Sequence, residues 1–468
     1  MNLSVRTKVF YGLGFVSVGI KDVLYTLFVF FYYNQVLGLD PLYTGLATFI
    51  SLFFDAFSDP IIGALSDNSQ NRKWGRRHPF MFLSALPLGI SIWLLFNPSA
   101  NLNNFELFCW LTIFSIFIRF FLTMYIVPAM SLGAELSTNY NERTVLTSFR
   151  LSFTTALQPL IFFIAIYFFF DSENSFDTAL QDPLAYRPFS IYCGIIMALS
   201  ILISSYGTKN SIPFLPINSK RESLISTIQI IKSALNLKSF STVLCFTALV
   251  YIAFGIGNTI TTYLLTYVFG FNEFEIVSIL VAGAFGGIFS AYFGPKLGEI
   301  FDKKKATIIC TILFSLGMTL PYFLRLLNLI PNNENPIIIF IVFFLYLFAF
   351  TFLWCAMSLS SSMMADVVDE YELKSGKRNE GIFFSTLSFA YKCTVGIGYL
   401  GGGLLLKIIS FPTQANSIQI SNDIINSLTF IGGPVLFFVY ISSLIFMYQY
   451  PLNHHEYKKI RTILDQKN

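Results

Sequence analysis

The chain has 468 residues, of which 54% are hydrophobic and only 12% are charged. Soluble domains carry about 25% charged residues, and this composition therefore excludes an ordinary soluble enzyme, a disordered chain and a nucleic-acid-binding protein. The formal net charge is only +4, and its distribution along the chain is more informative than its sum. We expect a membrane protein.

Long apolar stretches between polar breaks predict twelve membrane-spanning helices, at about 20 residues for each crossing. The predicted helices begin near residues 9, 42, 79, 105, 144, 187, 239, 274, 306, 336, 381 and 427. We expect the first stretch to be a retained helix and not a signal peptide, because Lys21 and Asp22 lie inside it and no small-residue cleavage site follows. The predicted fold class is an all-α membrane protein without an additional soluble domain.

The six cysteines fall in apolar stretches, with no CxxC spacing and no histidine beside them. Cysteines in such surroundings are expected to be small buried side chains, and not disulfides or metal ligands. They are Cys109, Cys193, Cys245, Cys310, Cys355 and Cys393.

The distribution of lysine and arginine predicts the orientation. Most of the 30 lie at the two termini and in the segments after predicted helices 2, 4, 6, 8 and 10. Positively charged segments stay in the cytoplasm, and both termini are therefore expected to be cytoplasmic, with the protein in the plasma (inner) membrane. Arg187, Arg325 and Lys407 are expected on the opposite side.

Two similar segments divide the chain into halves. The stretch from Gly63 to Asp67 and the stretch from Gly298 to Asp302 are each followed by a cluster of bases, after the second helix of a six-helix set. Duplicated halves around a midplane site are the architecture of secondary transporters. The predicted domains are a six-helix bundle at 1–206, a cytoplasmic linker at 207–238, a second six-helix bundle at 239–450 and a cytoplasmic tail at 451–468. Within the linker, 223–237 has an apolar face at helical spacing, which predicts a helix partly along the membrane surface.

Ionisable side chains inside the predicted spans are candidates for function, because an ionised group at the membrane centre costs about 2.5–3.5 kcal/mol. Asp55 and Asp59 are four residues apart, which places two carboxylates on one helix face. A monovalent cation such as Na⁺, or a proton, would relieve their repulsion. The alternative is that each carboxylate forms a static ion pair with Lys21, Arg119 or Lys392 and only holds the bundle together.

Two further residues extend this candidate site. Lys392 lies too deep in its span to reach the membrane surface, and we expect it to face the central cavity and to neutralise the aspartate pair when the cation is absent. A static salt bridge is the alternative. Thr123 lies four residues after Arg119, on the same helix face, where its hydroxyl is either a cation ligand or bonded to its own helix.

Charge-rich segments after predicted helices 2 and 10 are candidates for a cytoplasmic gate. Orientation alone explains the bases of the first segment, but the second segment mixes acids with bases, which orientation does not require. Ion pairs between the halves that form when the cytoplasmic side closes would explain the mixture, and a solvated loop is the alternative. The predicted gate residues are Arg76, Arg77, Asp366, Asp369, Lys377 and Arg378.

Four segments together resemble the major facilitator superfamily, and within it the glycoside-pentoside-hexuronide cation symporters typified by melibiose permease. The segments are GFVSVGIKD at 14–22, DAFSDPIIGALSDNSQNRKWGRRHPF at 55–80, VPAMSLGAELSTNYNERTVLTSFR at 127–150 and MMADVVDEYELKSGKRNEGIFFS at 363–385. The resemblance implies a twelve-helix fold in two six-helix pseudo-repeats that rock about a midplane site, and the import of a small polar solute with Na⁺, Li⁺ or H⁺.

The resemblance also implies roles for individual residues. It assigns the coupling cation to Asp55 and Asp59, with Thr123 as a further ligand, and it matches the helix-11 lysine of the family to Lys392. It assigns contacts with the solute to Lys21, Asp22 and Arg150. The full set of candidate solute-binding residues is Lys21, Asp22, Arg119, Ile126, Met130 and Arg150.

Two positions depart from the pattern of the family. Two residues before Pro128 the sugar-binding members carry an acid, and here that residue is Ile126; two residues after the proline, Met130 stands where they carry a stacking aromatic ring. The candidate site also has four bases against three acids and sums to +1 before a cation binds. These are Lys21, Arg119, Arg150 and Lys392 against Asp22, Asp55 and Asp59. An anionic glycoside, uronide or sulfonated sugar would suit it.

The expected function is therefore cation-coupled symport of a small polar solute, with a sugar, glycoside or uronide as the first candidate. One alternative is a transporter of lipids or other amphiphiles, whose cavity Ile126 and Met130 would line. A second is a sensor or scaffold with a transporter fold, although such a protein gains nothing from charged residues inside the membrane.

We do not expect an enzyme, because no nucleophile–base pair or metal cluster is recognisable and the histidines lie at loops or in the tail. The expected partners are the solute, a monovalent cation and the lipid bilayer. No cofactor and no nucleic acid are expected, and the protein is expected to be a monomer.

Overall fold

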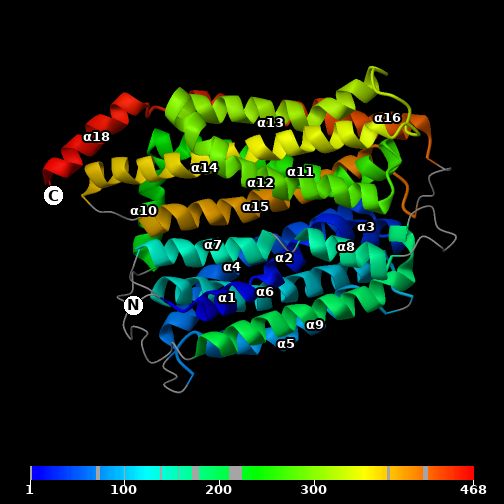
Figure 1. The fold of residues 1–468 in the computed structure, drawn as a ribbon, viewed down its shortest axis with the longest axis horizontal. Coiled ribbons are helices and arrows are strands. Elements are labelled where there is room, and N and C mark those ends of the chain that lie inside the picture. Colours follow the sequence, from blue (N-terminus) through cyan, green and yellow to red (C-terminus); the bar gives the residue numbers. More distant parts are fainter. Residues whose placement is uncertain are drawn as a thin grey trace. The chain divides into compact units, whose positions relative to one another are not determined.

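The computed structural model describes residues 3–69, 74–99, 101–136, 140–155, 158–170, 179–209, 224–376, 380–414 and 420–467. Every regular element in these ranges is a helix (Figure 1). Within them, 12 helical stretches are long and apolar enough to cross a membrane, and each begins close to its predicted start. The predicted all-α fold with twelve membrane-spanning helices is confirmed.

The chain divides into two compact units, which we describe separately. Unit 1 consists of Met1–Lys220, Asn272–Val277 and Leu406–Ile420, and unit 2 consists of Arg221–Phe271, Ser278–Leu405 and Ser421–Asn468. The predicted limits of the two bundles, the linker and the tail stay predictions.

Unit 1 contains the first six spans. Its α-helices are α1 (Val5–Leu13), α2 (Val16–Val23), α3 (Val29–Phe31), α4 (Pro41–Asn68), α5 (His78–Leu95), α6 (Asn104–Leu136), α7 (Tyr140–Thr155), α8 (Gln158–Phe168) and α9 (Pro183–Thr208). Two π-helical segments, η1 (Leu24–Phe28) and η2 (Tyr32–Val36), complete the first span, and η3 (Ala179–Gln181) is a 3₁₀ turn. Helix α4 packs against α6, and α5 packs against both α6 and α9 (Figure 1).

Unit 2 contains the other six spans and two shorter helices. Its α-helices are α10 (Leu224–Leu235), α11 (Lys238–Tyr263), α12 (Glu273–Phe301), α13 (Lys303–Leu326), α14 (Ile337–Ser375), α15 (Glu380–Ile408), α16 (Asn422–Phe430), α17 (Leu436–Tyr448) and α18 (His454–Lys467), with π-helical η5 (Leu264–Val268) and η7 (Ile431–Val435). The first residues of α12 and the last residues of α15 belong to unit 1. Helix α10 lies within the stretch predicted to be an amphipathic helix.

Sequence features account for where several spans begin. Asp40 precedes Pro41, and its carboxylate accepts a hydrogen bond of 2.8 Å from the backbone N–H of Leu42 at the start of α4. Asp182 before Pro183 does the same for α9. An acid at the N-cap satisfies one of the free N–H groups of the first turn, and proline fits the first helical position.

Glycine allows two helix pairs to approach at backbone distance. A Cβ atom at Gly89 of α5 would lie 2.7 Å from the carbonyl oxygen of Gly194 of α9, and one at Gly194 would lie 2.6 Å from that of Gly89. In unit 2, Gly398 of α15 faces Gly255 of α11 in the same way. Small residues at such contacts let membrane helices pack without the space that side chains require.

Two helices continue beyond the predicted spans. The sequence predicts a loop in the charged segment after predicted helix 10, but α14 extends through it to Ser375 and ends at Gly376, whose φ is +69°. Helix α6 likewise continues to Leu136. Charged residues end the apolar stretch and therefore the membrane span, but they do not interrupt the hydrogen bonds of the helix. A glycine at positive φ ends the helix itself.

The cysteines are less uniformly buried than predicted. Cys193, Cys310 and Cys355 are buried, whereas Cys109, Cys245 and Cys393 are half-buried, and none of the six forms a disulfide. The expectation that all six are buried is corrected for the latter three, because apolar side chains of a membrane helix can face lipid as well as the interior of the protein.

Candidate functional site

The two aspartates lie on α4 where this helix packs against α6. Thr123 of α6 meets both of them: its hydroxyl oxygen lies 2.8 Å from Oδ1 of Asp55 and 3.1 Å from Oδ1 of Asp59. Thr123 is 3% exposed and Asp55 is 8% exposed, whereas Asp59 is half-buried. The structure therefore brings together the three residues predicted to bind a cation.

The hydroxyl of Thr123 has a single hydrogen, which it can donate to one carboxylate at a time. Oxygen atoms of Asp55 and Asp59 nevertheless both lie within hydrogen-bond distance of it. Carboxylate and hydroxyl oxygens are the hard ligands that small cations prefer. A cation at this cluster, which we call the carboxylate pair, would reduce the repulsion between Asp55 and Asp59.

Arg119 lies one turn before Thr123 on α6 and is 6% exposed. Its Nη1 is 4.0 Å from Oδ2 of Asp55. Its Nε donates a hydrogen bond of 3.0 Å to the hydroxyl of Ser51, and its guanidinium carbon lies 4.8 Å from the centre of the Tyr25 ring. Arg119, predicted to contact the solute, thus lies beside the carboxylate pair.

Asp55, Asp59 and Arg119 bring two formal negative charges and one formal positive charge close together. At 4 Å, opposite unit charges attract by about 4 kcal/mol at an effective dielectric constant of about 20, before the cost of desolvation. The charge of Arg119 is therefore close enough to influence any ion at the carboxylate pair.

The other charged candidates of unit 1 lie on α2 and α7. Lys21 and Asp22 form an ion pair with each other on α2, and both are half-buried. Arg150 on α7, which packs against α2, is half-buried with its guanidinium carbon 5.8 Å from the centre of the Phe15 ring. These two helices therefore present charged side chains of both signs.

Ile126 and Met130 both lie on α6, after Thr123. Ile126 is half-buried, and Met130 is 46% exposed within unit 1. An exposed thioether offers neither a carboxylate for hydroxyl groups nor a flat ring for a sugar face. Their predicted part in solute binding stays a prediction.

Lys392 lies on α15 in unit 2 and is half-buried. Its predicted role as counter-charge of the aspartates stays a prediction.

The predicted gate residues of unit 1 converge on one acid that the sequence reasoning missed. Arg76 and Arg77 each place Nη2 2.5 Å from Oε1 of Glu135, and Nε of Arg77 donates to the same oxygen at 3.0 Å. Glu135 lies in the segment at 127–150 that resembles the family. It is the first acid of that segment, and this position could have indicated it as a partner for the two arginines.

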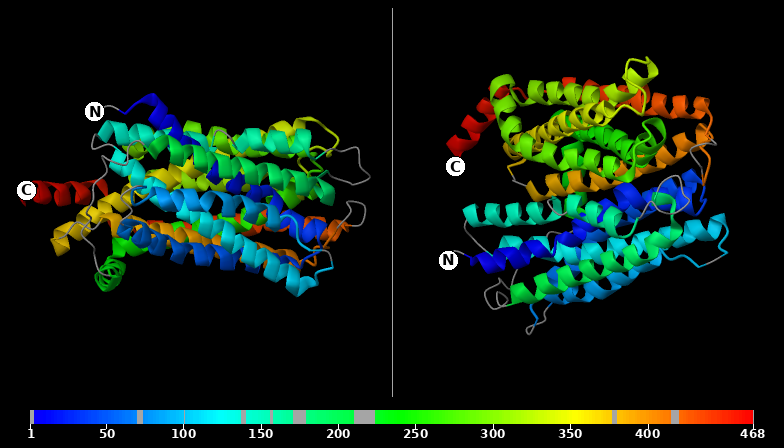
Figure 2. Two further views of the ribbon diagram at one scale, coloured as in Figure 1. Left: turned by 90° about the horizontal axis from the view of Figure 1, so that it is seen from below. Right: turned by 45° about the vertical axis from the view of Figure 1, so that its right-hand side comes forward.

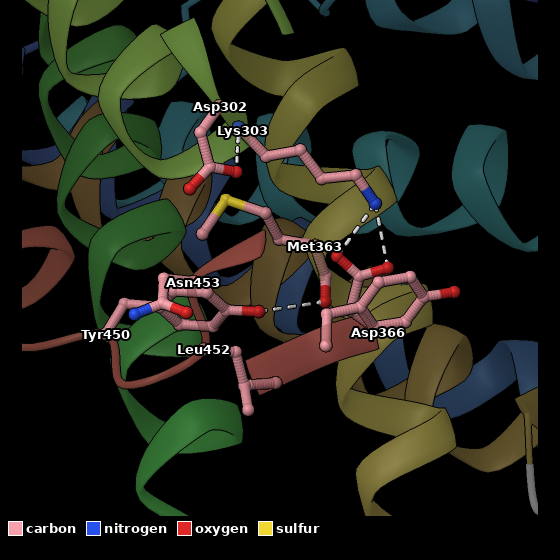
Figure 3. A pocket seen from close by; sticks show the side chains of 8 residues that line it. Asp302, Lys303, Met363, Asp366, Tyr450, Leu452 and Asn453 are labelled. Atoms are coloured by element: carbon pink, nitrogen blue, oxygen red, sulfur yellow. Dashed lines mark hydrogen bonds and ion pairs between the residues drawn. The ribbon is translucent and has the colours of Figure 1, made fainter. Parts of the chain in front are cut away.

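In unit 2 the predicted gate acids also have basic partners. Nζ of Lys303 lies 2.7 Å from both carboxylate oxygens of Asp366 (Figure 3). On α18, the hydroxyl of Tyr457 donates to Asp369 at 3.3 Å, and Nη1 of Arg461 lies 3.7 Å from the same carboxylate. Each of these pairs lies within unit 2, and the predicted ion pairs between the halves stay a prediction. Lys377 and Arg378 lie outside the described residues.

The contacts of Asp369 attach α18, the helix at the C-terminus (Figure 2), to α14, whereas the Lys303–Asp366 pair joins α13 to α14. Burial, together with the charges of Asp366 and Asp369, raises the pKa of Tyr457, and its hydroxyl therefore keeps the proton that it donates. The cavity that Lys303, Asp366 and Tyr457 line has a volume of about 20 Å³, enough for about one water molecule. It is too small for a sugar-sized solute.

Twelve apolar spans and a buried charge cluster inside a helical unit define a class of protein, the secondary transporters. Residues 10–454 match the family described as MFS/sugar transport protein, where MFS denotes the major facilitator superfamily. The chain belongs to this family, and with it to the cation symporters of the glycoside-pentoside-hexuronide type. It is a multi-pass membrane transporter and not an enzyme.

Three relatives from Escherichia coli (strain K12) are similar over most of their length. A putative sulfoquinovose importer is 27% identical, over 89% of this chain and 85% of the relative. A putative glycoside/cation symporter is 24% identical, with the same shares covered. A glucuronide carrier protein homolog is 24% identical, over 99% of this chain and 96% of the relative.

A solved structure supports the fold. The crystal structure of the nucleoside transporter NupG aligns with a TM-score of 0.61 and 13% identity, covering 96% of this chain and 100% of the transporter chain. At this identity the similarity concerns the fold alone.

Proposed function

We propose that this protein imports an anionic sugar derivative together with a monovalent cation, Na⁺ or H⁺, that binds at the carboxylate pair. The observation that carries the proposal is the hydroxyl of Thr123, which lies within hydrogen-bond distance of both Asp55 and Asp59. Two carboxylates at one buried hydroxyl repel each other, and a cation between them would relieve this repulsion. The similarity to a putative glycoside/cation symporter supports the coupling to a cation.

Coupling follows from this electrostatic requirement. When the halves rock, the site passes through a conformation that is closed to water on both sides. Enclosing the carboxylate pair there costs less free energy when a bound cation neutralises its charge. The bound cation therefore favours the conformational exchange that carries the solute. Lys392 is proposed as the counter-charge after the cation has left.

The coupling is tested by neutralising one carboxylate in proteoliposomes. Asp59→Asn and Asp55→Cys should lose accumulation driven by a Na⁺ or pH gradient, because either change removes part of the cation site. Exchange of solute down its own gradient should persist. The matched control is Glu106→Gln, which neutralises an exposed acid at the start of α6. Accumulation equal to that of the parent protein in both aspartate variants, at equal amounts of protein, would contradict the proposal.

The proposed solute class rests on charge. Lys21 and Arg150 can pair with a carboxylate or sulfonate in charge-assisted hydrogen bonds, whereas Ile126 provides no acceptor for the hydroxyl groups of a neutral sugar. Two relatives are named for anionic sugars, a putative importer of sulfoquinovose, which is a sulfonated sugar, and a glucuronide carrier protein homolog. We therefore propose that uronides and sulfonated sugars bind more tightly than neutral disaccharides.

The variant Ile126→Asp tests the solute class. The added carboxylate should repel an anionic solute and accept hydrogen bonds from a neutral one, each worth about 0.5–1.5 kcal/mol. We expect anions to outcompete neutral sugars in the parent protein by about one to two decades, and this preference to reverse in the variant. Competition between labelled and unlabelled sugars for uptake measures the preference in the parent protein and in the variant. Equal binding of neutral sugars and uronides by the parent, without reversal in the variant, would refute the anion preference and leave the cation proposal intact.

A further inference from the structure

Arg119 is a basic side chain that lies beside the carboxylate pair. It is buried on α6, and its Nη1 reaches the edge of ion-pair distance, at 4.0 Å from Asp55. An ordinary stabilising ion pair would bring the guanidinium and the carboxylate closer, to about 2.7–2.9 Å between nitrogen and oxygen.

Two contacts hold the guanidinium at this distance. The hydroxyl of Ser51, which is fully buried on α4, accepts the hydrogen bond from Nε of Arg119 at 3.0 Å and itself donates to the carbonyl oxygen of Thr48 at 2.8 Å. The ring of Tyr25 lies 4.8 Å from the guanidinium carbon, within the range of an attractive cation–π contact. The positive charge is therefore held beside Asp55 without being in direct contact with it.

We propose that Arg119 is a built-in cation that competes with the coupling ion for the carboxylate pair, and that it thereby lowers the affinity for Na⁺. This inference rests on the proposed function of the carboxylate pair. The reason is electrostatic, because a fixed positive charge near Asp55 repels an arriving cation.

The effect on affinity distinguishes this role from a structural one. If Arg119 only held Asp55 in place, its removal would weaken ion binding. If Arg119 competes with the ion, its removal strengthens ion binding. Removal of the Ser51 hydroxyl gives a second test, with the opposite expected effect. Without the hydrogen bond from Arg119 to Ser51, the guanidinium can approach Asp55 and compete more strongly with the ion.

The experiment measures Na⁺ binding by calorimetry to the purified full-length protein, and Na⁺-dependent uptake in proteoliposomes. Arg119→Gln should lower the half-saturating Na⁺ concentration at least tenfold, equivalent to about 1.4 kcal/mol, or produce saturable binding where the parent protein shows none. Ser51→Ala should raise the half-saturating concentration. Arg119→Lys, which keeps the charge, should stay within about threefold of the parent.

Three results would overturn the inference. They are unchanged or weaker Na⁺ binding in folded Arg119→Gln protein, shifts of Arg119→Gln and Ser51→Ala in the same direction, or an Arg119→Lys protein that behaves like Arg119→Gln.

Failure of the proposed function can be distinguished from failure of this inference. Tighter Na⁺ binding without cation-driven uptake in any variant would refute the symport and leave the role of Arg119 standing. Cation-driven uptake in proteins whose Na⁺ binding does not change when Arg119 is replaced would refute the role of Arg119 and leave the symport standing.

Discussion

The hydroxyl of Thr123 is the residue-scale feature on which the cation site depends. Thr123→Val keeps the shape of the side chain and removes its oxygen, and a hydrogen bond to a charged group is worth about 1.5–3 kcal/mol. We therefore expect the variant to need at least about tenfold more cation for half-maximal uptake. Cation-dependent uptake in proteoliposomes measures this shift.

Thr123→Ser provides the control for this prediction, because it keeps the hydroxyl group and should behave like the parent protein. Equal cation dependence in Thr123→Val and Thr123→Ser would show that the hydroxyl oxygen at this position contributes nothing to cation binding.

Sequence reasoning found part of this cluster and missed another part, for a physical reason. The spacing of Asp55 and Asp59 places both carboxylates on one face of a helix whatever that helix packs against. The hydrogen bond between Ser51 and Arg119 joins α4 to α6, and it depends on how far one helix is shifted along the other. No local pattern in the sequence determines that shift, and the sequence therefore offered Lys21, Arg119 and Lys392 as alternative partners of the aspartates without selecting Arg119 for Asp55.

At the scale of elements, the contact between α5 and α9 makes a prediction about stability. Gly194→Leu would place a side chain where the backbone of Gly89 lies, since even a Cβ atom would come within 2.6 Å of its carbonyl oxygen. Overpacking of this kind costs about 1–3 kcal/mol or more. We expect a lower midpoint of thermal unfolding for the variant purified in detergent.

Gly63→Ala on α4 is the matched control, because a Cβ atom there would lie 3.6 Å from the nearest atom, in the side chain of Val127. This variant should unfold at the same temperature as the parent protein or slightly higher, since alanine favours helix more than glycine. A Gly194→Leu protein as stable as the Gly63→Ala protein would show that α5 and α9 can move apart without cost.

The ends of the elements were the least predictable part of the fold. Hydropathy locates a span, and the twelve spans were found in this way, but it does not show whether the helix stops where the apolar stretch stops. Helix α14 continues to Ser375 with charged residues in its last turns. For the same reason hydropathy places Asp366 in a loop, and its ion pair with Lys303, from the start of another helix, could not be anticipated.

For the whole molecule, the distribution of lysine and arginine predicts that both termini are cytoplasmic. Green fluorescent protein fused after the last residue should therefore fluoresce in cells, and alkaline phosphatase fused there should be inactive. The matched control is a fusion after Asn332, between α13 and α14, where the two reporters should give the opposite result. An active phosphatase at the C-terminus would contradict the predicted orientation and place the C-terminus on the opposite side of the membrane.

If one monovalent ion enters with each solute molecule, the charge of the solute determines whether the membrane voltage drives uptake. On the proposed stoichiometry of one monovalent ion in each cycle, import of a neutral sugar carries one net positive charge inward, and a membrane voltage contributes about 2.3 kcal/mol per 100 mV. Import of a monoanionic sugar carries no net charge. Uptake of the proposed solutes would then be electroneutral, indifferent to voltage, and dependent only on the concentration gradients of the ion and the solute.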